Sequence, residues 1–590
     1  MRRFALFLTA SSFLLTTAAC GGGSDASAAD TIYYNAKVIT VDADFDLAEA
    51  VATLGDKIVA VGTNEEVRKL ASKSTNEIDL EGKTLIPGFY DTHSHLRGPQ
   101  QPWKWGGFIN SVPEWLVGVD TMPKLQKALV EKISETPKGE WVVGALTREE
   151  WPNFAIPTRS DLDIISPDNP VVLRRGPHTS IANSLALKLA GISRDTKVEG
   201  GEIVHGPDGE PNGKIFESGQ ELLNKVIPQE VLDRAFPGDK GKDAWKSLLK
   251  QMASVGITSV NIAGIRPPDI APLNQLYEES GDELPRLNAE LRVFPTWDFY
   301  EDPMKDGVPA TIKEFEQLGN PSEIFSHPKL KMSGMKINVD GGLSAPIFYS
   351  VEDYASRPGF HGSLRIPENA FYAIAKYAHD HNWQIGVHTM GDAATIMSVD
   401  TIDRIMKENP RSNSRHYLHH VLQTLPEETM KKMAVNNIIV SSQPGFLLTL
   451  GAYGDEALKN EQKERQNPGR SLLDHGIKVV YGSDALPTGP ISHIFAGVTR
   501  TGWDNKVHGI EEAVTIQEAL RMHTADAAYI TYDEGNRGSI EPGKFADLVI
   551  LDSDPLTIDP SELWTIKVER TIIGGKEVFN ILRDGDPMKQ

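Results

Sequence analysis

The sequence has little of several features that would assign a protein to a class. Cys20 is the only cysteine in 590 residues, so no internal disulfide can form, and a chain of this length needs none to build its core. No basic run follows the first residues, and 60 basic side chains stand against 81 acidic ones, a net charge of −21 that disfavours nucleic-acid binding. Beyond residue 20 no apolar stretch is long enough to span a membrane. The chain also lacks a Gly-x-Ser-x-Gly motif, which disfavours a serine hydrolase.

The first twenty residues have the order of a cleaved export signal. Arg2 and Arg3 precede an apolar run that is too short for a stable membrane anchor, and small residues lead to Cys20. This order is similar to a bacterial lipoprotein signal, although Thr17 stands where such signals usually have an aliphatic residue. We therefore expect an exported protein of the periplasm or cell envelope, tethered by residues 21–30 and touching the membrane only through a lipid on Cys20. Ordinary secretion with a chance cysteine remains the alternative.

Both ends of the chain that follows the predicted signal have the sequence pattern of a small β-sheet. Short β-rich pieces separated by turns occupy residues 31–85, and the same texture returns in residues 535–590. Neither end has enough apolar positions to bury a two-sided core alone. We therefore predict one composite β-sandwich domain built from both chain ends.

The region 86–534 has the pattern of a (β/α)8 barrel. Apolar runs end in polar or charged residues and are separated by helix-length segments, as in βα units of a parallel sheet. Eight such runs occur, starting at Leu85, Gly256, Leu291, Met332, Gln384, His416, Asn437 and Lys478. Eight strands close a barrel, so the predicted fold class is α/β, a TIM-type barrel. Residues 97–254 form one insertion after the first strand, and we expect it to roof the active-site face.

Potential metal ligands stand at the ends of these strands. His93 and His95 lie two residues apart at the end of the first strand, so their imidazoles converge, which suits zinc or a similar divalent ion. A His-x-His pair alone is weak evidence, because such pairs are often surface residues. The pattern is stronger because His388 ends the fifth strand, His420 the sixth and Asp484 the eighth. Together they predict a metal site at the barrel mouth.

Several motifs in this order resemble the amidohydrolase superfamily, in the branch that includes enzymes like N-substituted formamide deformylase. They are PGFYDTHSH, the PTRSDLDIISPDNPVVLRRGPHTSIANSLALKLAGI segment, GGEIVHGPDGEPNGKIFE, MKINVDGG, VHTMGDAA, SSQP and YGSD. The resemblance implies that Lys336 is carboxylated and bridges two metal ions, because a free ammonium would be repelled by the cations whereas a carbamate supplies oxygen ligands. The alternative is a lysine hydrogen-bonded to Asp340 or to substrate beside a single ion.

The resemblance also implies roles for residues outside the ligand set. Asp484 is expected to be the catalytic acid–base as well as a ligand, and His178 and Asn183 of the insertion match positions near the substrate. Helix capping and loop packing are an equally good account of those two residues. Two positions depart from the family pattern: His419 replaces a usual glutamate and is expected to face away from the ligand His420, and Phe446 replaces a usual histidine.

The expected reaction is hydrolysis of a carbon–nitrogen bond in a non-peptide amide of a small molecule by a metal-activated hydroxide, with one or two ions. Asp484 would take the proton of the water and return it to the departing nitrogen. Two alternatives remain open: a lipid-tethered binding protein without turnover, and the same site acting on esters.

Overall fold

The computed structural model describes residues 28–103, 105–147, 151, 156–198, 201–235, 241–293, 302–344 and 347–589. The predicted signal 1–20 and most of the tether 21–30 lie outside the described residues, as does the end of the third predicted strand run, from residue 294 onward. Within the described part, no helix is both long enough and apolar enough to cross a membrane.

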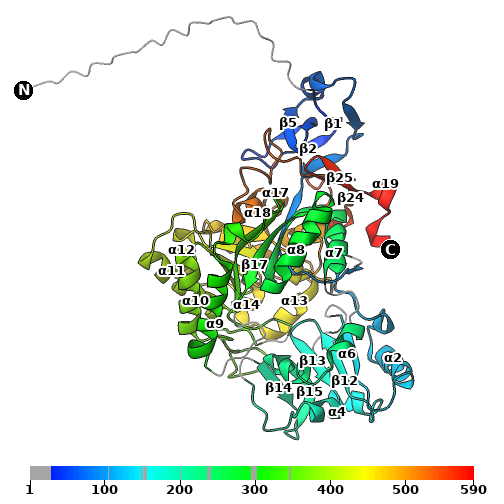
Figure 1. The fold of residues 1–590 in the computed structure, drawn as a ribbon, viewed down its shortest axis with the longest axis vertical. Coiled ribbons are helices and arrows are strands. Elements are labelled where there is room, and N and C mark those ends of the chain that lie inside the picture. The colour runs from blue at the N-terminus through cyan, green and yellow to red at the C-terminus, as the bar shows by residue number, and fades with distance from the viewer. Residues whose placement is uncertain are drawn as a thin grey trace, which may run out of the picture.

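An eight-stranded parallel sheet forms the centre of the molecule and curls into a barrel (Figure 1). Its strands follow one another in chain order: β8 (Phe89–Ser94), β16 (Ile257–Ile265), β17 (Arg286–Arg292), β18 (Leu330–Asn338), β19 (Gln384–Thr389), β20 (Tyr417–His420), β21 (Ile439–Ser442) and β22 (Val479–Tyr481). The backbone amides of Ser483 and Asp484 donate to the carbonyl of His93, which joins the end of β22 to β8. The predicted fold class is confirmed, and each of the eight predicted runs overlaps one strand.

The third strand begins earlier than predicted, at Arg286 rather than Leu291. Its first half alternates apolar residues with polar ones, and both kinds are buried. Arg286 pairs with Asp547 outside the barrel sheet, whereas Asn288 and Glu290 are buried and hydrogen-bond to side chains of β8 and β16. A search for apolar runs misses the beginning of such a strand, because its polar side chains are buried with hydrogen-bonding partners.

Helices cover the outside of the barrel. Residues 368–381 and 426–435 have apolar residues at helical spacing, which predicts helices, and they contain α10 (Glu368–Asp380) and α12 (Glu427–Val435). The other helices after residue 240 are α7 (Lys242–Ser254), α8 (Pro267–Ser280), α9 (Val308–Leu318), α11 (Asp392–Glu408), α13 (Gly445–Ala457), α14 (Asn460–Glu464), α15 (Arg470–Asp474), α16 (Pro490–Thr499), α17 (Ile516–Met522), α18 (Ala525–Ile530) and α19 (Ile581–Asp584). Apolar faces such as Phe371, Ile374 and Ala378 of α10 are fully buried and form the main core with the strands.

Strands from both chain ends share one six-stranded sheet. Its order is β25 (Lys576–Asn580), β24 (Val568–Ile573), β23 (Leu548–Leu551), β7 (Thr84–Pro87), β2 (Lys37–Ile39) and β3 (Leu47–Ala48). Leu85 of β7 pairs with Val38 on one side and with Ile550 on the other. A second sheet has the order β5 (Lys57–Gly62), β4 (Ala50–Leu54), β1 (Thr31–Tyr34) and β6 (Asn76–Asp79), beside α1 (Asn64–Val67). The exact domain boundaries stay predictions.

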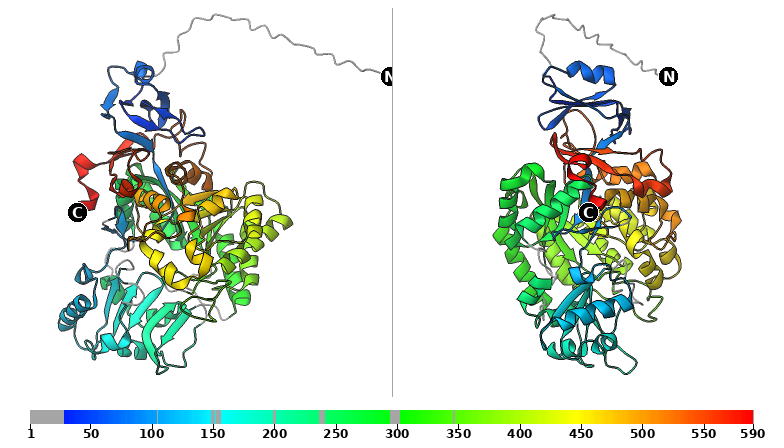
Figure 2. Two further views of the ribbon diagram at one scale, coloured as in Figure 1. Left: turned by 180° about the vertical axis from the view of Figure 1, so that it is seen from behind. Right: turned by 90° about the vertical axis from the view of Figure 1, so that its right-hand side faces the viewer.

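The insertion after β8 contains its own five-stranded sheet. The strands, in spatial order, are β11 (Val142–Leu146), β12 (Val171–Arg175), β13 (Thr179–Ala182), β15 (Pro211–Glu217) and β14 (Gly201–His205). Its helices are α2 (Met122–Ser134), α3 (Arg159–Asp163), α4 (Ser184–Leu189), α5 (Glu221–Asn224) and α6 (Gln229–Ala235), and a short β9 (Gln101–Pro102) and β10 (Phe108–Ile109) pair precedes them. The glycine-rich region seen in the sequence is the β14–β15 hairpin. Figure 2 shows the insertion at one end of the barrel and the terminal sheets at the other.

Candidate metal centre

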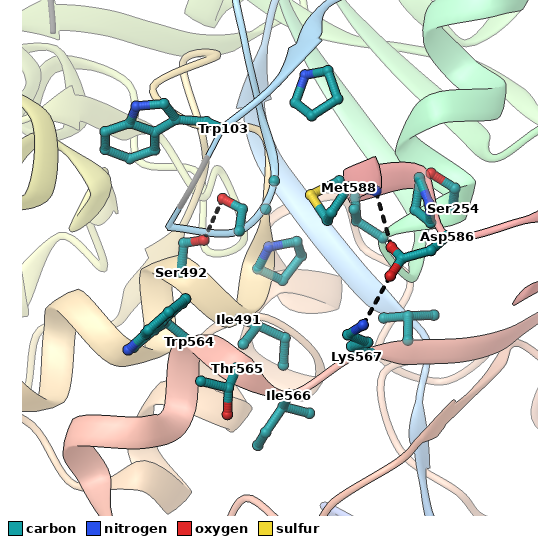
Figure 3. Close-up of a pocket in the computed structure, with 18 of the residues that line it drawn as sticks. Trp103, Ser254, Ile491, Ser492, Trp564, Thr565, Ile566, Lys567, Asp586 and Met588 are labelled. Carbon is teal, nitrogen blue, oxygen red and sulfur yellow. Dashed lines mark hydrogen bonds and ion pairs between the residues drawn. The ribbon is translucent and has the colours of Figure 1, made fainter. Parts of the chain in front are cut away.

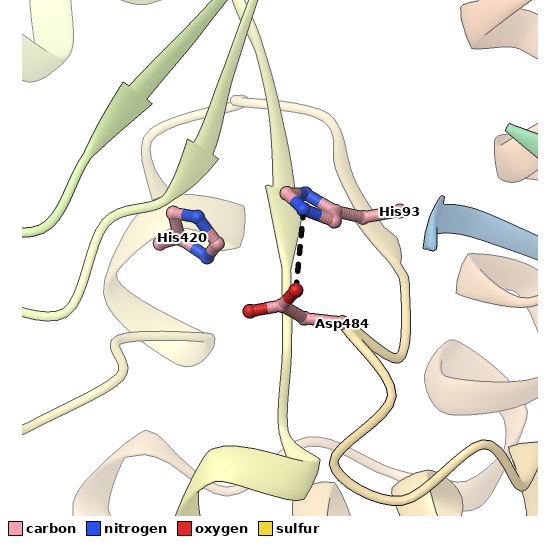
Figure 4. Close-up of side chains that lie close together, drawn as sticks. All are labelled: His93, His420 and Asp484. Atoms are coloured by element: carbon pink, nitrogen blue, oxygen red, sulfur yellow. Dashed lines mark ion pairs between the residues drawn. The ribbon is translucent and has the colours of Figure 1, made fainter. Parts of the chain in front are cut away.

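Three predicted ligands from three different strands converge at the barrel mouth. His93 of β8, His420 of β20 and Asp484 after β22 each place a ligand atom within 4.8 Å of the others (Figure 4). His93 Nε2 lies 3.6 Å from Asp484 Oδ1. Two imidazole nitrogens and a carboxylate oxygen form a donor set of the kind that divalent transition metals bind.

The remaining predicted histidines border this group. His95 Nε2 lies 2.9 Å from Asp484 Oδ1. The ring of His388 in β19 lies 4.5 Å from that of His420, centroid to centroid, and its Nε2 is 3.3 Å from the carbonyl oxygen of Gly341. All five side chains thus lie at the same end of the barrel, although their roles as ligands stay predictions.

Unusual backbone conformations turn two of these side chains into the site. His420 and Val421 have φ of 78° and 56°, and Asp484 and Ala485 have φ of 47° and 59°. Such left-handed conformations are uncommon outside glycine and gather at functional sites where the surroundings hold them. Asp91 holds the Asp484 loop, because its carboxylate accepts from Ser483 N at 2.8 Å and from Ser483 Oγ at 2.6 Å.

The site histidines are held in the neutral form that metal ligation requires. Burial lowers the pKa of His95 to about 4 and that of His420 to about 3. Burial, followed by the charges of neighbouring groups, lowers the pKa of His93 and of His388 well below the usual value. His420 Nδ1 lies 2.6 Å from Gln443 Oε1, and Gln443 Nε2 already donates to the Ser441 carbonyl. His420 therefore donates its Nδ1 hydrogen to Gln443, which leaves its Nε2 lone pair for a metal.

Lys336 of β18 is buried beneath the predicted ligands. Its residue is 2% exposed, and Nζ has no hydrogen-bond partner among the described residues. Burial lowers the pKa of Lys336 to about 7, so the amine is largely uncharged in mildly basic solution. Asp340, the partner in the alternative interpretation, instead accepts from the backbone amides of Met390, Gly391 and Tyr349. The neutral imidazoles and the largely uncharged amine of Lys336 would not repel a divalent cation. These side chains therefore fit such an ion.

The prediction that His419 faces away from the site is wrong. His419 Nδ1 lies 2.7 Å from His93 Nδ1, and its Nε2 lies 3.1 Å from Glu290 Oε2. Alternation of side chains holds only in extended backbone, and the chain leaves that conformation at His420, the next residue. His419 and His420 therefore both contact His93, by ring-centroid distances of 4.3 and 4.8 Å.

The insertion delivers His178 to the same end of the barrel. His178 Nδ1 lies 2.8 Å from Glu217 Oε1, and that oxygen also accepts from Gly342 N at 2.9 Å. Glu217 Oε2 lies 3.0 Å from Arg365 Nη1. A Cβ on Gly342 would stand 2.8 Å from the His178 ring, so the imidazole packs directly on the loop that follows β18. The backbone of Glu217 lies in the left-handed region, with φ of 49°, which is uncommon outside glycine.

Asn183 does not have a free side chain for a substrate, and this corrects its predicted role. Its Oδ1 accepts from Val171 N and Ala186 N, and its Nδ2 donates to the Ser166 and Asn169 carbonyls. These four bonds use the whole hydrogen-bonding capacity of the amide. Asn183 is fully buried and caps α4, which matches the structural alternative.

Four neighbours of the ligands were not singled out by sequence. Glu290, Glu217, Gln443 and Asp91 are buried carboxylates or amides. Three of them stand within the motifs quoted above, but they contact side chains or loops of other elements, so position in the sequence alone gave them no role. Phe446, which stands where the family pattern usually has a histidine, stacks on the His420 ring at a centroid distance of 5.5 Å and an interplanar angle of 15°. An apolar ring therefore covers one side of this ligand.

A second cavity, of about 350 Å³, lies against the C-terminal segment (Figure 3). Its walls include Trp103, Trp564, Ile566 and Met588, and it shares no lining residue with the metal centre. The titratable residues that line it, Lys567 and Asp586, pair with each other at 2.8 Å. The two charges therefore compensate each other within the cavity wall.

Comparisons with known proteins agree with the donor set. The sequence profile of the amidohydrolase family matches residues 76–579. The chain is similar to N-substituted formamide deformylase of Arthrobacter pascens, with 28% identity over 557 residues that cover 92% of this chain and 97% of the relative. It is also similar to protein LONG AFTER FAR-RED 3 of Arabidopsis thaliana, with 26% identity over 566 residues, 93% of this chain and 92% of the relative. A solved metal-dependent hydrolase of uncharacterized function from Pyrococcus horikoshii shares the fold, with a TM-score of 0.63, 20% identity and coverage of 90% and 99%.

Proposed function

Because the chain belongs to the amidohydrolase family and is a hydrolase, we propose that it cleaves a carbon–nitrogen bond in a small non-peptide amide. The observation that carries this proposal is the convergence of His93, His420 and Asp484, with His95, His388 and the buried amine of Lys336 beside them. The similarity to a formamide deformylase supports an N-acyl or N-formyl substrate.

The same residues would hold one or two divalent ions, for which zinc is our choice. When bound, such an ion acidifies a coordinated water and polarises a carbonyl. His93, His95, His388, His420 and Asp484 would supply neutral nitrogens and a carboxylate oxygen, and a carboxylated Lys336 would supply two more oxygens. An uncharged lysine amine is the form that reacts with carbon dioxide, so the lowered pKa of Lys336 supports this modification.

The proton transfers fall to Asp484. Its Oδ1 points to His95 and His93, so the carboxylate borders the space where the water and the substrate carbonyl would meet. Asp484 would accept a proton from the attacking water and return it to the departing nitrogen, as a general base and then a general acid. His178, held by Glu217 at the mouth, would contact the substrate from the roof.

The test combines metal analysis with a substrate panel. Purified protein is assayed for divalent metal per chain and for turnover of N-formyl, N-acyl and cyclic amides and matched esters, before and after chelation. We expect bound metal and amide hydrolysis that chelation abolishes. Asp484→Asn should lower kcat by about a hundred- to ten-thousand-fold.

Asp455→Asn is the matched control, because Asp455 pairs with His508 at 3.4 Å and has similar exposure, 24% against 18% for Asp484. It should leave kcat unchanged. Faster turnover of esters than of amides would move the activity to that class. Absence of both metal and turnover would favour a tethered binding protein.

We also propose that the protein is exported and held at the membrane by a lipid on Cys20. The order of Arg2, Arg3, the apolar run and the small residues before Cys20 supports this, and the glycine-rich residues 21–24 supply a flexible tether.

A further inference from the structure

Three buried side chains from three strands form a continuous hydrogen-bonded chain behind one ligand. His93 Nδ1 of β8 lies 2.7 Å from His419 Nδ1 of β20, and His419 Nε2 lies 3.1 Å from Glu290 Oε2 of β17. The side chains of His419 and Glu290 are 0% exposed, and that of His93 is 1% exposed. Water therefore does not complete this chain, and its hydrogens must be shared among the protein groups.

The hydrogen positions follow from the chemistry of a ligand histidine. His93 Nε2 is the nitrogen that faces Asp484, so ligation there requires a lone pair on Nε2 and a hydrogen on Nδ1. Two Nδ1 atoms at 2.7 Å need one donor and one acceptor, so His419 must accept at Nδ1. A neutral His419 then carries its hydrogen on Nε2, where Glu290 Oε2 is the acceptor.

Glu290 is itself held in place. Asn261 Nδ2 of β16 donates to Glu290 Oε1 at 2.6 Å, so the carboxylate has one oxygen fixed and the other aimed at His419. The neighbouring ligand His420 reaches the same result in one step, because Gln443 Oε1 accepts its Nδ1 hydrogen. Two side chains, His419 and Glu290, thus support His93, whereas one, Gln443, supports His420.

We propose that His419 and Glu290 are positioning residues that fix His93 in the tautomer and orientation required of a metal ligand. This inference rests on the proposed function and adds two residues to the site that contact neither metal nor substrate. In this chain the histidine at position 419 extends the contact of His93 across the barrel interior to a carboxylate on β17.

Metal affinity measured on the apoprotein tests the inference without relying on turnover. Zinc is titrated into chelator-stripped full-length protein in competition with a chromophoric chelator. Loss of such supporting partners typically weakens metal binding about 10- to 100-fold. We expect this loss for His419→Phe, which keeps a ring but offers no acceptor, and for Glu290→Gln, which removes the charge.

His419→Gln separates positioning from packing. Its amide oxygen can accept the His93 hydrogen as Gln443 does for His420, so it should bind zinc more tightly than His419→Phe. The matched control is His379→Phe, because His379 is 1% exposed and forms a comparable 2.8 Å contact with His416. It should leave zinc affinity unchanged.

The outcomes are distinguishable. Wild-type protein that binds no zinc would overturn the proposed function together with this inference. Wild-type protein that binds zinc, with Glu290→Gln and both His419 variants binding equally well, would overturn this inference alone. Should His419→Phe fail to fold by circular dichroism, the Glu290→Gln and His419→Gln affinities decide the question, and wild-type values for both would overturn it.

Discussion

At the scale of single residues, the site contains a lysine, Lys336, whose amine has no hydrogen-bond partner among the described residues. Burial is the largest cause that lowers the pKa of Lys336 from 10.5 to about 7, because a charged ammonium loses its hydration in the barrel interior. The same burial raises the pKa of Glu290 to about 7. Burying these groups lowers the stability of the folded apoprotein. The uncharged amine is suited to reaction with carbon dioxide, and the site is suited to binding cations.

Lys336→Met tests this burial through the pH dependence of stability. Between pH 7 and 10.5 the unfolded chain holds the Lys336 proton whereas the folded apoprotein releases it, so the free energy of unfolding should rise with pH. The variant lacks this proton and should gain less. Urea unfolding of metal-free protein at pH 7.5 and 9.5, in buffer free of carbon dioxide, measures the difference. An identical pH dependence for both proteins would show that the amine is not buried as described.

At the scale of elements, the barrel closes through a glycine. A Cβ on Gly482 would lie 2.4 Å from the backbone nitrogen of His93, so only glycine lets the loop after β22 approach β8 closely enough for Asp484 N to reach the His93 carbonyl. The contact that completes the barrel is therefore also the contact that brings Asp484 to the ligand histidines.

Gly482→Ala should separate these two strands. We expect a loss of about 1–3 kcal/mol of stability from overpacking and weaker metal binding, because Asp484 moves with the loop. Thermal unfolding and zinc titration measure the two effects. Gly535→Ala is the control, since no atom lies within 4 Å of its added methyl group. Equal behaviour of the two variants would contradict the proposed closure.

The insertion is attached to the barrel by ion pairs of very different burial. Glu217, 1% exposed, contacts His178, Arg365 and the backbone of Gly342, whereas Glu202 pairs with Arg357 in a half-exposed position. Both pairs join the insertion to the loop that follows β18. We expect the loss of one partner to reduce the free energy of unfolding by different amounts in the two pairs.

Glu217→Gln should destabilise the protein by about 3–5 kcal/mol, because it removes the negative charge from a buried ion pair with Arg365. It should also raise KM, since His178 loses its support. Glu202→Gln, at the exposed pair, should cost about 1 kcal/mol or less and leave KM unchanged. Chemical unfolding and steady-state kinetics distinguish them. Two variants with equal losses would mean that burial does not set the strength of this attachment.

At the scale of the whole molecule, the insertion and the terminal sheets lie at opposite ends of the barrel (Figure 1). The described chain begins at Ala28, beside the terminal sheets, and His178 of the insertion packs on the loop after β18 at the far end. A protein anchored through Cys20 would therefore present its mouth away from the membrane.

Cys20→Ser tests the anchor. A lipid cannot be attached to serine in this way, so the variant should appear in the soluble fraction of the cell envelope, whereas the wild type should sediment with membranes and dissolve in detergent. Amide hydrolysis by the purified proteins should be equal, because residue 20 lies outside the barrel. Soluble wild-type protein would favour ordinary secretion.

The sequence alone determined the barrel and which candidate metal ligands lie at its mouth. Periodic runs of apolar residues located all eight strands, because a parallel strand buried on both faces leaves a continuous signal. The sequence brought His93, His95, His388, His420 and Asp484 together as candidate ligands, because residues at the ends of parallel strands meet at one end of a barrel. The third strand began too late in the prediction, since its buried polar residues break the apolar run.

Only the tertiary structure decided which side chains support the ligands. Asn183 proved to be a helix cap with all its hydrogen bonds used within the insertion, and His419 proved to contact His93. Glu290, Glu217 and Gln443 meet their partners across 20 or more positions of the chain, so no spacing in the sequence marks them. Sequence carries local periodicity, whereas a buried hydrogen bond between strands depends on where the closed barrel places each side chain.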